Sequence, residues 1–257
     1  MGGFEAKHGL LKTTLIALVS LGAFLAGEGI IHAGEEKTQA PWKAHIELSN
    51  VTTSGNTDTG TLAGKLEAKK EGKVDRYILK GNLLRAEDRG QEKANKWFLD
   101  ARWERILKEK LFGFLTASYL KDKFSGYDYR VNAGPGVGYS FIETEDHELK
   151  GLVAILYSSD KFSEGDKSTD SYASRKTALN YVWHISENLK FVENADYLVS
   201  FEDTDRYFAN SETALEAKVN GAVSLGASYT ISYQHKPPFP NIQRTDKVFL
   251  TSLIIDF

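Results

Sequence analysis

The feature that most constrains this chain is a strict alternation of side-chain character over long runs of residues. Within 223–234, Val, Leu, Ala, Tyr, Ile and Tyr occupy every second position, and small or polar residues fill the positions between them. Successive side chains of a β-strand point to opposite faces, so this period predicts a strand with one apolar and one polar face. The same period recurs in 97–104 and 130–141. We therefore expect a fold built from such strands.

Segments with this period continue to the end of the chain, separated by clusters of turn-forming residues. They span residues 42–54, 57–70, 76–87, 93–107, 111–124, 129–142, 148–162, 171–183, 189–200, 207–219, 223–234 and 245–257. Strands of about 9 to 11 residues cross a bilayer when tilted, and closure pairs every backbone group that lipid cannot satisfy. The expected fold class is all-β, an up-and-down antiparallel transmembrane β-barrel of about 12 strands over residues 42–257.

The connections between the predicted strands support this arrangement. Every second one is short, which suits periplasmic turns: 71–75, 108–110, 143–147, 185–188 and 220–222. Four others are longer or more charged and suit outer loops: 88–92, 163–170, 201–206 and 235–244. Outer-membrane barrels have short turns on one side and longer loops on the other. Two connections depart from the trend, because Gly55-Asn56 signals a tight hairpin and 125–128 only a modest turn.

The N-terminal 33 residues have the layout of a secretory signal peptide. Lys7, His8 and Lys12 precede an apolar stretch over 13–26, and Ala33 places a small residue at the expected cleavage position. We expect cleavage after Ala33, a disordered lead-in over 34–41, and export to the outer membrane of a Gram-negative-type bacterium. The chain contains no Cys, which excludes a lipid-modified N-terminal Cys and a disulfide framework.

Several short motifs occur in order along the mature chain, at 54–59 (SGNTDT), 124–130 (FSGYDYR), 134–139 (GPGVGY), 202–207 (EDTDRY), 210–213 (NSET) and in the closing segment 245–257. Together they resemble the DUF481 family, of the salt-induced outer membrane protein type. The resemblance implies an outer-membrane barrel linked to salt or osmotic conditions. It implies no established activity, and therefore no catalytic residues.

The chain ends at Phe257, with Ile255, Leu253 and Phe249 spaced by twos behind it. A terminal aromatic residue on an alternating strand is similar to the signal that the barrel assembly machinery reads. We therefore expect this machinery as a partner, together with outer-membrane lipid and lipopolysaccharide. The formal net charge of −3 gives no indication of a nucleic-acid partner.

The inner face of the predicted barrel carries charges of both signs. The predicted lumen-lining residues are Glu47, Lys65, Glu67, Lys80, Asp100, Arg102, Glu104, Arg130, Lys176, Asp196, Glu212, Glu216 and Lys218. Such a lining is typical of a narrow, porin-like pore whose charges bias ion selectivity. It is equally typical of a lumen filled by paired side chains and water. Two functions stay open: a pore or osmotic-stress envelope component, and a structural or adhesion barrel with a plugged lumen.

Other candidate sites are less well supported. Gly134, Gly136 and Gly138 alternate on the predicted inner face, which indicates space for a bulky inward group or a solute path. Carboxylates of two outer loops could collect divalent cations, although neither loop has EF-hand spacing and a solvated acidic loop is favoured. These are Glu202, Asp203 and Asp205, with Glu164, Asp166 and Asp170 on the other loop.

A lipid-modifying enzyme is the remaining alternative. Among His45, His147, His184 and His235, only His235 lies near the predicted outer rim. No Ser and carboxylate pair is placed beside it by the sequence, as a catalytic triad would require. We therefore expect no enzymatic activity, no cofactor and no metal.

Overall fold

The computed structural model describes residues 42–53, 59–163 and 169–257. Within these ranges the chain forms twelve strands. They are β1 Trp42–Thr53, β2 Thr59–Glu71, β3 Asp75–Asp88, β4 Gln91–Ile106, β5 Leu111–Asp122, β6 Tyr127–Glu143, β7 His147–Phe162, β8 Thr169–Ser186, β9 Leu189–Ser200, β10 Tyr207–Lys218, β11 Val223–Gln234 and β12 Thr245–Asp256. The predicted signal peptide, lead-in and Gly55-Asn56 hairpin lie outside the described residues.

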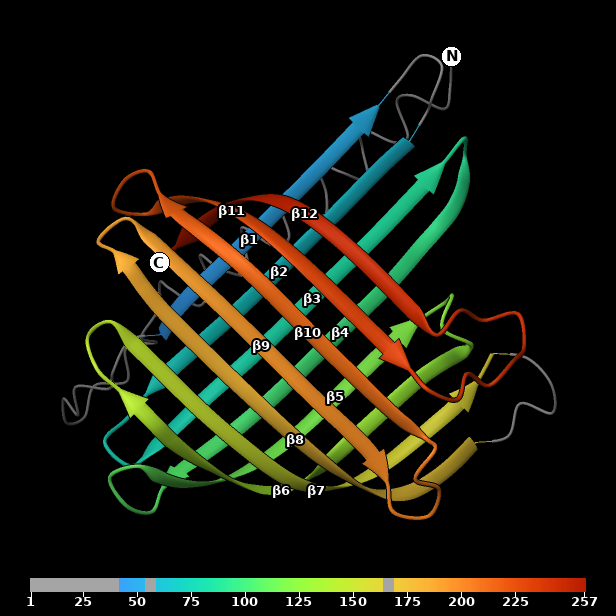
Figure 1. Ribbon diagram of the computed structural model, residues 1–257, viewed down its shortest axis with the longest axis horizontal. Helices are drawn as coiled ribbons and strands as arrows, with labels where there is room; N and C mark the ends of the chain where they lie inside the picture. Colours follow the sequence, from blue (N-terminus) through green and yellow to red (C-terminus); the bar gives the residue numbers. More distant parts are fainter. Residues whose placement is uncertain (1–41, 54–58, 164–168) are drawn as a thin grey trace, which may run out of the picture.

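Each strand pairs antiparallel with its neighbours in chain order, and β12 returns to pair with β1 (Figure 1). At this closing seam Ile46 lies opposite Ile255 and Leu48 opposite Leu253. The seam extends to the last residue, because the amide of Phe257 donates to the carbonyl of Ala44 over 2.9 Å. The prediction of an up-and-down barrel of about 12 strands is confirmed. No helix long and apolar enough to span a membrane occurs within the described ranges.

The end of the barrel that holds Trp42 and Phe257 is called the terminal end here, and the opposite end the loop end. The connection over 88–92, predicted as a longer or more charged outer loop, lies at the loop end with the other predicted outer loops, but it is a tight hairpin turn. Arg89 and Gly90 form it with φ values of 49° and 76°. Positive φ at both central residues is the mark of a type I′ turn, which usually begins with Asn, Asp or Gly. An Arg at its first position gives no such signal.

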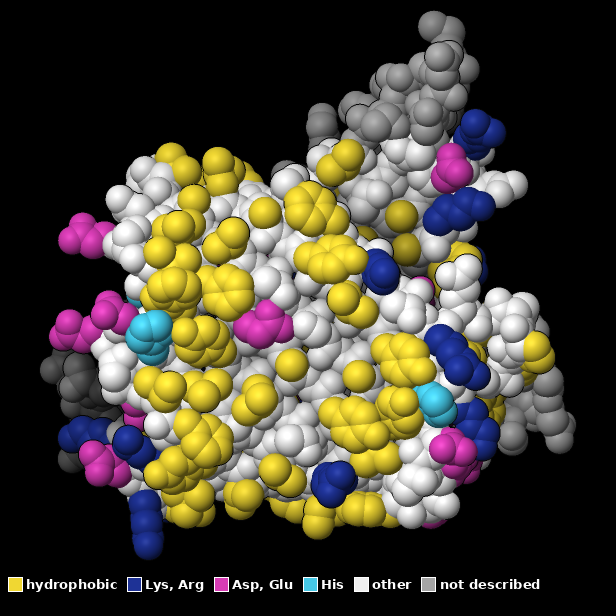
Figure 2. Space-filling view, viewed as in Figure 1, with side chains coloured by type: hydrophobic (Ala, Val, Ile, Leu, Met, Phe, Trp, Pro, Cys, Tyr) yellow, Lys and Arg dark blue, Asp and Glu magenta, His cyan; other side chains and the backbone are white. Residues whose placement is uncertain are grey.

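The outer wall of the barrel is apolar. Leu99, Ile155, Tyr157 and Phe249 are each about 60% exposed, and all belong to the outward set of alternating positions. Figure 2 shows hydrophobic side chains spread over the visible wall, with most charged side chains gathered toward its two ends. A wall of this kind is the inverse of a soluble protein's surface, where contiguous apolar patches stay small.

Aromatic rings gather near both ends of this wall. At the loop end, the Tyr207 ring lies 5.3 Å from that of Tyr197 and 5.8 Å from that of Tyr233, measured between centroids. At the terminal end, His147 stacks on Trp183 at 5.7 Å. Aromatic girdles of this kind flank the apolar band of membrane barrels.

Candidate functional site: the barrel lumen

The register places all thirteen predicted lumen-lining residues on the inward set of positions. Glu47 lies opposite Lys65, and Glu67 lies opposite Lys80. The inward set alternates strictly with the exposed apolar positions of the outer wall, so these charged side chains share the interior. Most of them have ion-pair or hydrogen-bond partners there.

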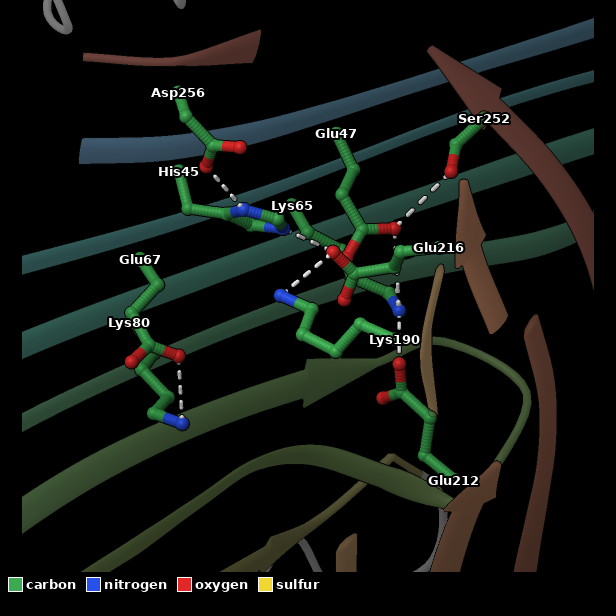
Figure 3. A network of polar contacts seen from close by, with 10 residues as sticks. All are labelled: His45, Glu47, Lys65, Glu67, Lys80, Lys190, Glu212, Glu216, Ser252 and Asp256. Carbon is green, nitrogen blue, oxygen red and sulfur yellow. Dashed lines mark hydrogen bonds and ion pairs between the residues drawn. The ribbon is translucent and has the colours of Figure 1, made fainter. Parts of the chain in front are cut away.

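A polar network occupies the lumen toward the terminal end (Figure 3). It consists of His45, Glu47, Lys65, Glu67, Lys80, Lys190, Glu212, Glu216, Ser252 and Asp256. The Nδ1 atom of His45 lies 2.7 Å from a carboxylate oxygen of Asp256, and its Nε2 atom lies 3.3 Å from Glu47. The hydroxyl of Ser252 donates to the other oxygen of Glu47 over 3.3 Å. These contacts tie β1 to β12 on the inner side of the closing seam.

Lys65 is the member of the polar network that reaches across the lumen. Its ammonium group on β2 donates to Glu212 on β10, and it lies 3.6 Å from Glu47 on β1. Strands β1, β12 and β11 separate β2 from β10 around the wall, so the pair spans the interior. The three side chains are between 16% and 25% exposed, so water reaches them.

The other ion pairs of the polar network run along the wall. Lys80 contacts Glu67 at 2.8 Å from the neighbouring strand, and Lys190 contacts Glu216 at 2.8 Å in the same way. Farther along β3, beyond Lys80, the inward side chain of Asn82 is exposed. The interior beside β2 and β3 is therefore open to water.

The opposite side of the lumen is filled by apolar side chains, called the luminal core here. Its members are Phe112, Phe114, Tyr127, Leu152, Ala154, Leu156, Leu198 and Phe208. Gly136 and Gly138 make room for two of these rings. A Cβ at Gly136 would lie 2.2 Å from the Phe114 ring, and one at Gly138 would lie 2.2 Å from the Phe112 ring. The prediction that these glycines clear space for a bulky inward group is confirmed.

Gly134 has a different role from the other two glycines. A Cβ there would lie 2.2 Å from the backbone carbonyl oxygen of Ile155, so this glycine permits a close approach of β7 to β6. This stretch of the β6–β7 pair includes Pro135, which donates no ladder hydrogen bond.

Two of the predicted lumen-lining residues, Arg102 and Glu104, lie against the luminal core rather than beside open water. Glu104 forms ion pairs with Arg76 at 2.8 Å and with Arg102 at 3.0 Å. The guanidinium groups lie over the core rings, with Arg76 4.7 Å from the centroid of Phe112 and Arg102 5.7 Å from that of Phe114. Cation–π contacts of this kind stabilise a charge held against an apolar surface.

A buried charge cluster narrows the lumen near the loop end. Arg130 donates to Asp160 over 2.8 Å, and the hydroxyl of Tyr172 donates to the other oxygen of Asp160 over 3.0 Å. The Arg130 guanidinium lies between two rings, 4.3 Å from the centroid of Tyr127 and 3.5 Å from that of Phe208. Phe208 belongs to β10 and Arg130 to β6, so this contact joins facing walls of the barrel.

The β11–β12 loop crosses the mouth above this cluster. A Cβ at Gly126, in the β5–β6 loop, would lie 2.5 Å from the ring of Pro238. The side chain of Gln234 also donates to the carbonyl of Ser125 over 3.5 Å. These two loops stand on opposite sides of the barrel, six strands apart. The loop-end mouth is therefore narrowed by the chain itself.

The remaining predicted residues are placed as follows. Lys176 lies 3.6 Å from Asp196, and Asp100 accepts a hydrogen bond from Thr116 at 3.1 Å. Lys218 is exposed at the last position of β10. The sequence reading left out Arg76, Asp160, Lys190 and Asp256, although all four share the inward parity. The alternation of the sequence already placed these four residues on the inward face. Each of them stands near the end of a predicted strand, however, where an inward position is hard to distinguish from a loop position.

The alternative sites find little support within the described part of the chain. No group of three or more His, Asp or Glu side chains is arranged to hold a metal ion among residues 42–53, 59–163 and 169–257. Asp203 in the β9–β10 loop accepts from Lys236 at 2.7 Å, while Glu164 and Asp166 lie outside the described residues. His235 contacts Tyr233 at 3.0 Å and stacks on Tyr207 at 4.6 Å. It lines a rim pocket of about 480 Å³ with Lys236 and Arg244.

Comparison with known proteins agrees with the barrel fold. The COG4313 outer membrane channel from Pseudomonas putida F1 superposes with a TM-score of 0.51 at 8% identity, over 88% of this chain and 100% of that one. The NanC porin gives a TM-score of 0.48 at 9% identity, over 84% and 97%. The uncharacterized protein YdiY of Escherichia coli K12 is 24% identical over 213 residues, 83% of this chain and 82% of that protein. A family model described as "Protein of unknown function, DUF481" matches residues 46–257, and the chain therefore belongs to the DUF481 family.

Proposed function

We propose that this protein is an outer-membrane β-barrel that forms a narrow pore for small ions or solutes. The observation that carries the proposal is the division of the closed barrel into an apolar outer wall and a charged interior that water reaches. The exposed side chain of Asn82 and the partly exposed side chains of Glu47 and Lys65 lie on the same side of that interior. A continuous wet surface inside a lipid-facing wall is what a permeation path requires.

The membrane location rests on the outer wall. Exposed apolar residues and two aromatic girdles would lie in lipid and at its interfaces, and the closed ladder leaves no strand edge for lipid to face. We propose lipid and lipopolysaccharide as the surroundings, and the assembly machinery as the partner that reads the strand ending at Phe257. Export with cleavage after Ala33 and a link to salt or osmotic stress stay predictions.

The proposed path is off-centre. The luminal core fills the side formed by β5–β7 with parts of β9 and β10. The path then runs beside the polar network, between that core and β1–β3. Twelve strands enclose less space than the sixteen or more of open porins, so the pore is expected to admit only small solutes.

Single-channel recording in planar lipid bilayers tests the proposal. The purified barrel should give discrete steps of small conductance in KCl. The same preparation unfolded by heat before addition is the control, and it should give none. Absence of steps from the folded protein at every salt concentration and voltage would overturn the pore.

A second candidate, a structural barrel with a plugged lumen, has one observation in its favour. The contact of Arg130 with Phe208 and the passage of Pro238 over Gly126 narrow the loop-end mouth. The same recordings decide between the two, because a plugged barrel gives no steps. We propose that the barrel is not an enzyme, since His235 contacts two Tyr side chains and the described residues that line its pocket include no Ser for a triad.

A further inference from the structure

We infer that the pore selects cations over anions, and that Lys65 limits this selectivity and the conductance as a tethered ammonium group held in the permeation path. The inference rests on the proposed pore and deepens it. It is carried by the charge of the polar network and by the geometry of Lys65 within it.

The polar network has more negative than positive groups. Its ten residues include five carboxylates against three ammonium groups, so an excess of two negative charges remains when His45 is neutral and of one when it is protonated. Carboxylates that line a pore favour cations over anions. The apolar luminal core opposite has a low dielectric constant, which focuses this potential onto the path.

Lys65 stands apart from the other two lysines of the network. Lys80 and Lys190 pair with carboxylates on adjacent strands, so their ammonium groups follow the wall. Lys65 reaches from β2 to Glu212 on β10 while also lying near Glu47 on β1 (Figure 3). Its ammonium thus occupies a position between carboxylates of separate strands, away from the wall.

A free cation that crosses the network would be stabilised at this same position, between the carboxylates of Glu47 and Glu212. The ammonium competes with such a cation for the oxygens of Glu47 and Glu212, and its side chain also narrows the path. Removing its charge therefore frees two carboxylates for permeating ions without adding any group to the lumen.

The test compares Lys65→Met with Lys80→Met. Each variant removes one positive charge from the same network and keeps an unbranched side chain, so they differ only in whether the lost ammonium crosses the lumen. Reversal potentials in a KCl gradient measure selectivity, and step size measures conductance. We expect cation selectivity in the wild type. Lys65→Met should raise both the conductance and the K⁺ to Cl⁻ preference by roughly twofold to fivefold, and Lys80→Met by clearly less.

Glu212→Gln provides a second measurement that does not depend on folding of the Lys65 variant. It should lower the cation preference, because it removes one of the two carboxylates. Heat-modifiable migration in gels verifies the barrel for each protein. Channels that prefer anions or show no preference, or equal effects of the two lysine variants, would overturn this inference alone. Absence of channels in every protein would overturn the pore itself.

Discussion

At Gly136 a single hydrogen atom in place of a side chain lets the Phe114 ring lie against β6. We predict that Gly136→Ala destabilises the barrel by about 1–3 kcal/mol, because the new methyl group would meet the ring and force it off its position. The contact to be relieved is 2.2 Å. Urea unfolding of the protein in detergent micelles, followed by Trp fluorescence, measures the change.

Gly60→Ala is the matched control, since no atom lies within 4 Å of the methyl group that it would introduce. Its unfolding midpoint should stay at the wild-type value. The double variant Gly136→Ala with Phe114→Leu should recover part of the lost stability. Equal midpoints for the two alanine variants would contradict the role assigned to Gly136.

The buried ion pair between Arg130 and Asp160 should contribute strongly to the stability of the barrel. Arg130→Met leaves the carboxylate of Asp160, whose side chain is 1% exposed, with only the Tyr172 hydroxyl as a side-chain donor. Loss of one partner from a buried ion pair costs about 3–5 kcal/mol. Unfolding in urea should show a decrease of this order.

A rim ion pair supplies the comparison for Arg130. Lys123, whose side chain is 62% exposed, pairs with Glu92 at 2.5 Å. Lys123→Met should leave the stability nearly unchanged, because surface pairs contribute little. Similar losses for the two variants would mean that burial of the Arg130 cluster has no energetic role.

Two loops at the loop end are joined by an ion pair whose pH dependence can be predicted. The Lys236 ammonium donates to the Asp203 carboxylate over 2.7 Å and lowers the pKa of Asp203 below its ordinary value of 3.8. A carboxyl group with a lowered pKa stabilises the folded state above its ordinary pKa and loses that contribution as the pH falls through the lowered value. The link between the loops should therefore be complete at neutral pH and lost only below pH 3.8.

The carboxyl ¹³C chemical shift of Asp203 reports this titration directly. Its midpoint should lie below 3.8 in the wild type and rise toward that value in Lys236→Met. Lys123→Met, at a separate place on the rim, should leave it unchanged. A wild-type midpoint above the ordinary value, or one that Lys236→Met does not move, would contradict the pairing.

The β11–β12 loop crosses the loop-end mouth and should therefore limit the conductance of the pore. Replacing residues 236–243 by a short Gly-Ser linker removes the contact of Pro238 with Gly126 and uncovers the mouth. Single-channel conductance should increase. A Gly-Ser replacement of the turn 220–222, at the terminal end, should have no such effect. Unchanged conductance after loop replacement would place the limiting constriction deeper in the lumen.

For the whole molecule, the sequence predicted the wall far better than the interior. Alternation defined all twelve strands, because a lipid-facing wall repeats its apolar residues at every second position. Alternation did not show which face of β5 points inward. The residues at the start of this strand, Leu111, Phe112, Gly113, Phe114 and Leu115, are apolar or small on both faces. Nothing local to these residues indicates that two of the rings fill the lumen.

The cross-lumen contacts were beyond prediction for a different reason. Lys65 and Glu212 are 147 residues apart and lie on strands that do not pair. Their contact depends on the cross-section of the closed barrel, which local alternation does not define. The sequence therefore predicted which side chains face inward, but not which of them meet or where the path lies.

The central claim, that a wet interior and a lipid-facing wall alternate at successive residues, is tested most directly by cysteine accessibility along β3. The chain has no Cys of its own, so single replacements give unambiguous labels. In liposomes, a charged, membrane-impermeant thiol reagent should modify Cys at Lys80 and Asn82, and should leave Cys at Leu79 and Leu83 unmodified. Modification of all four positions alike, or of the two leucine positions alone, would contradict it.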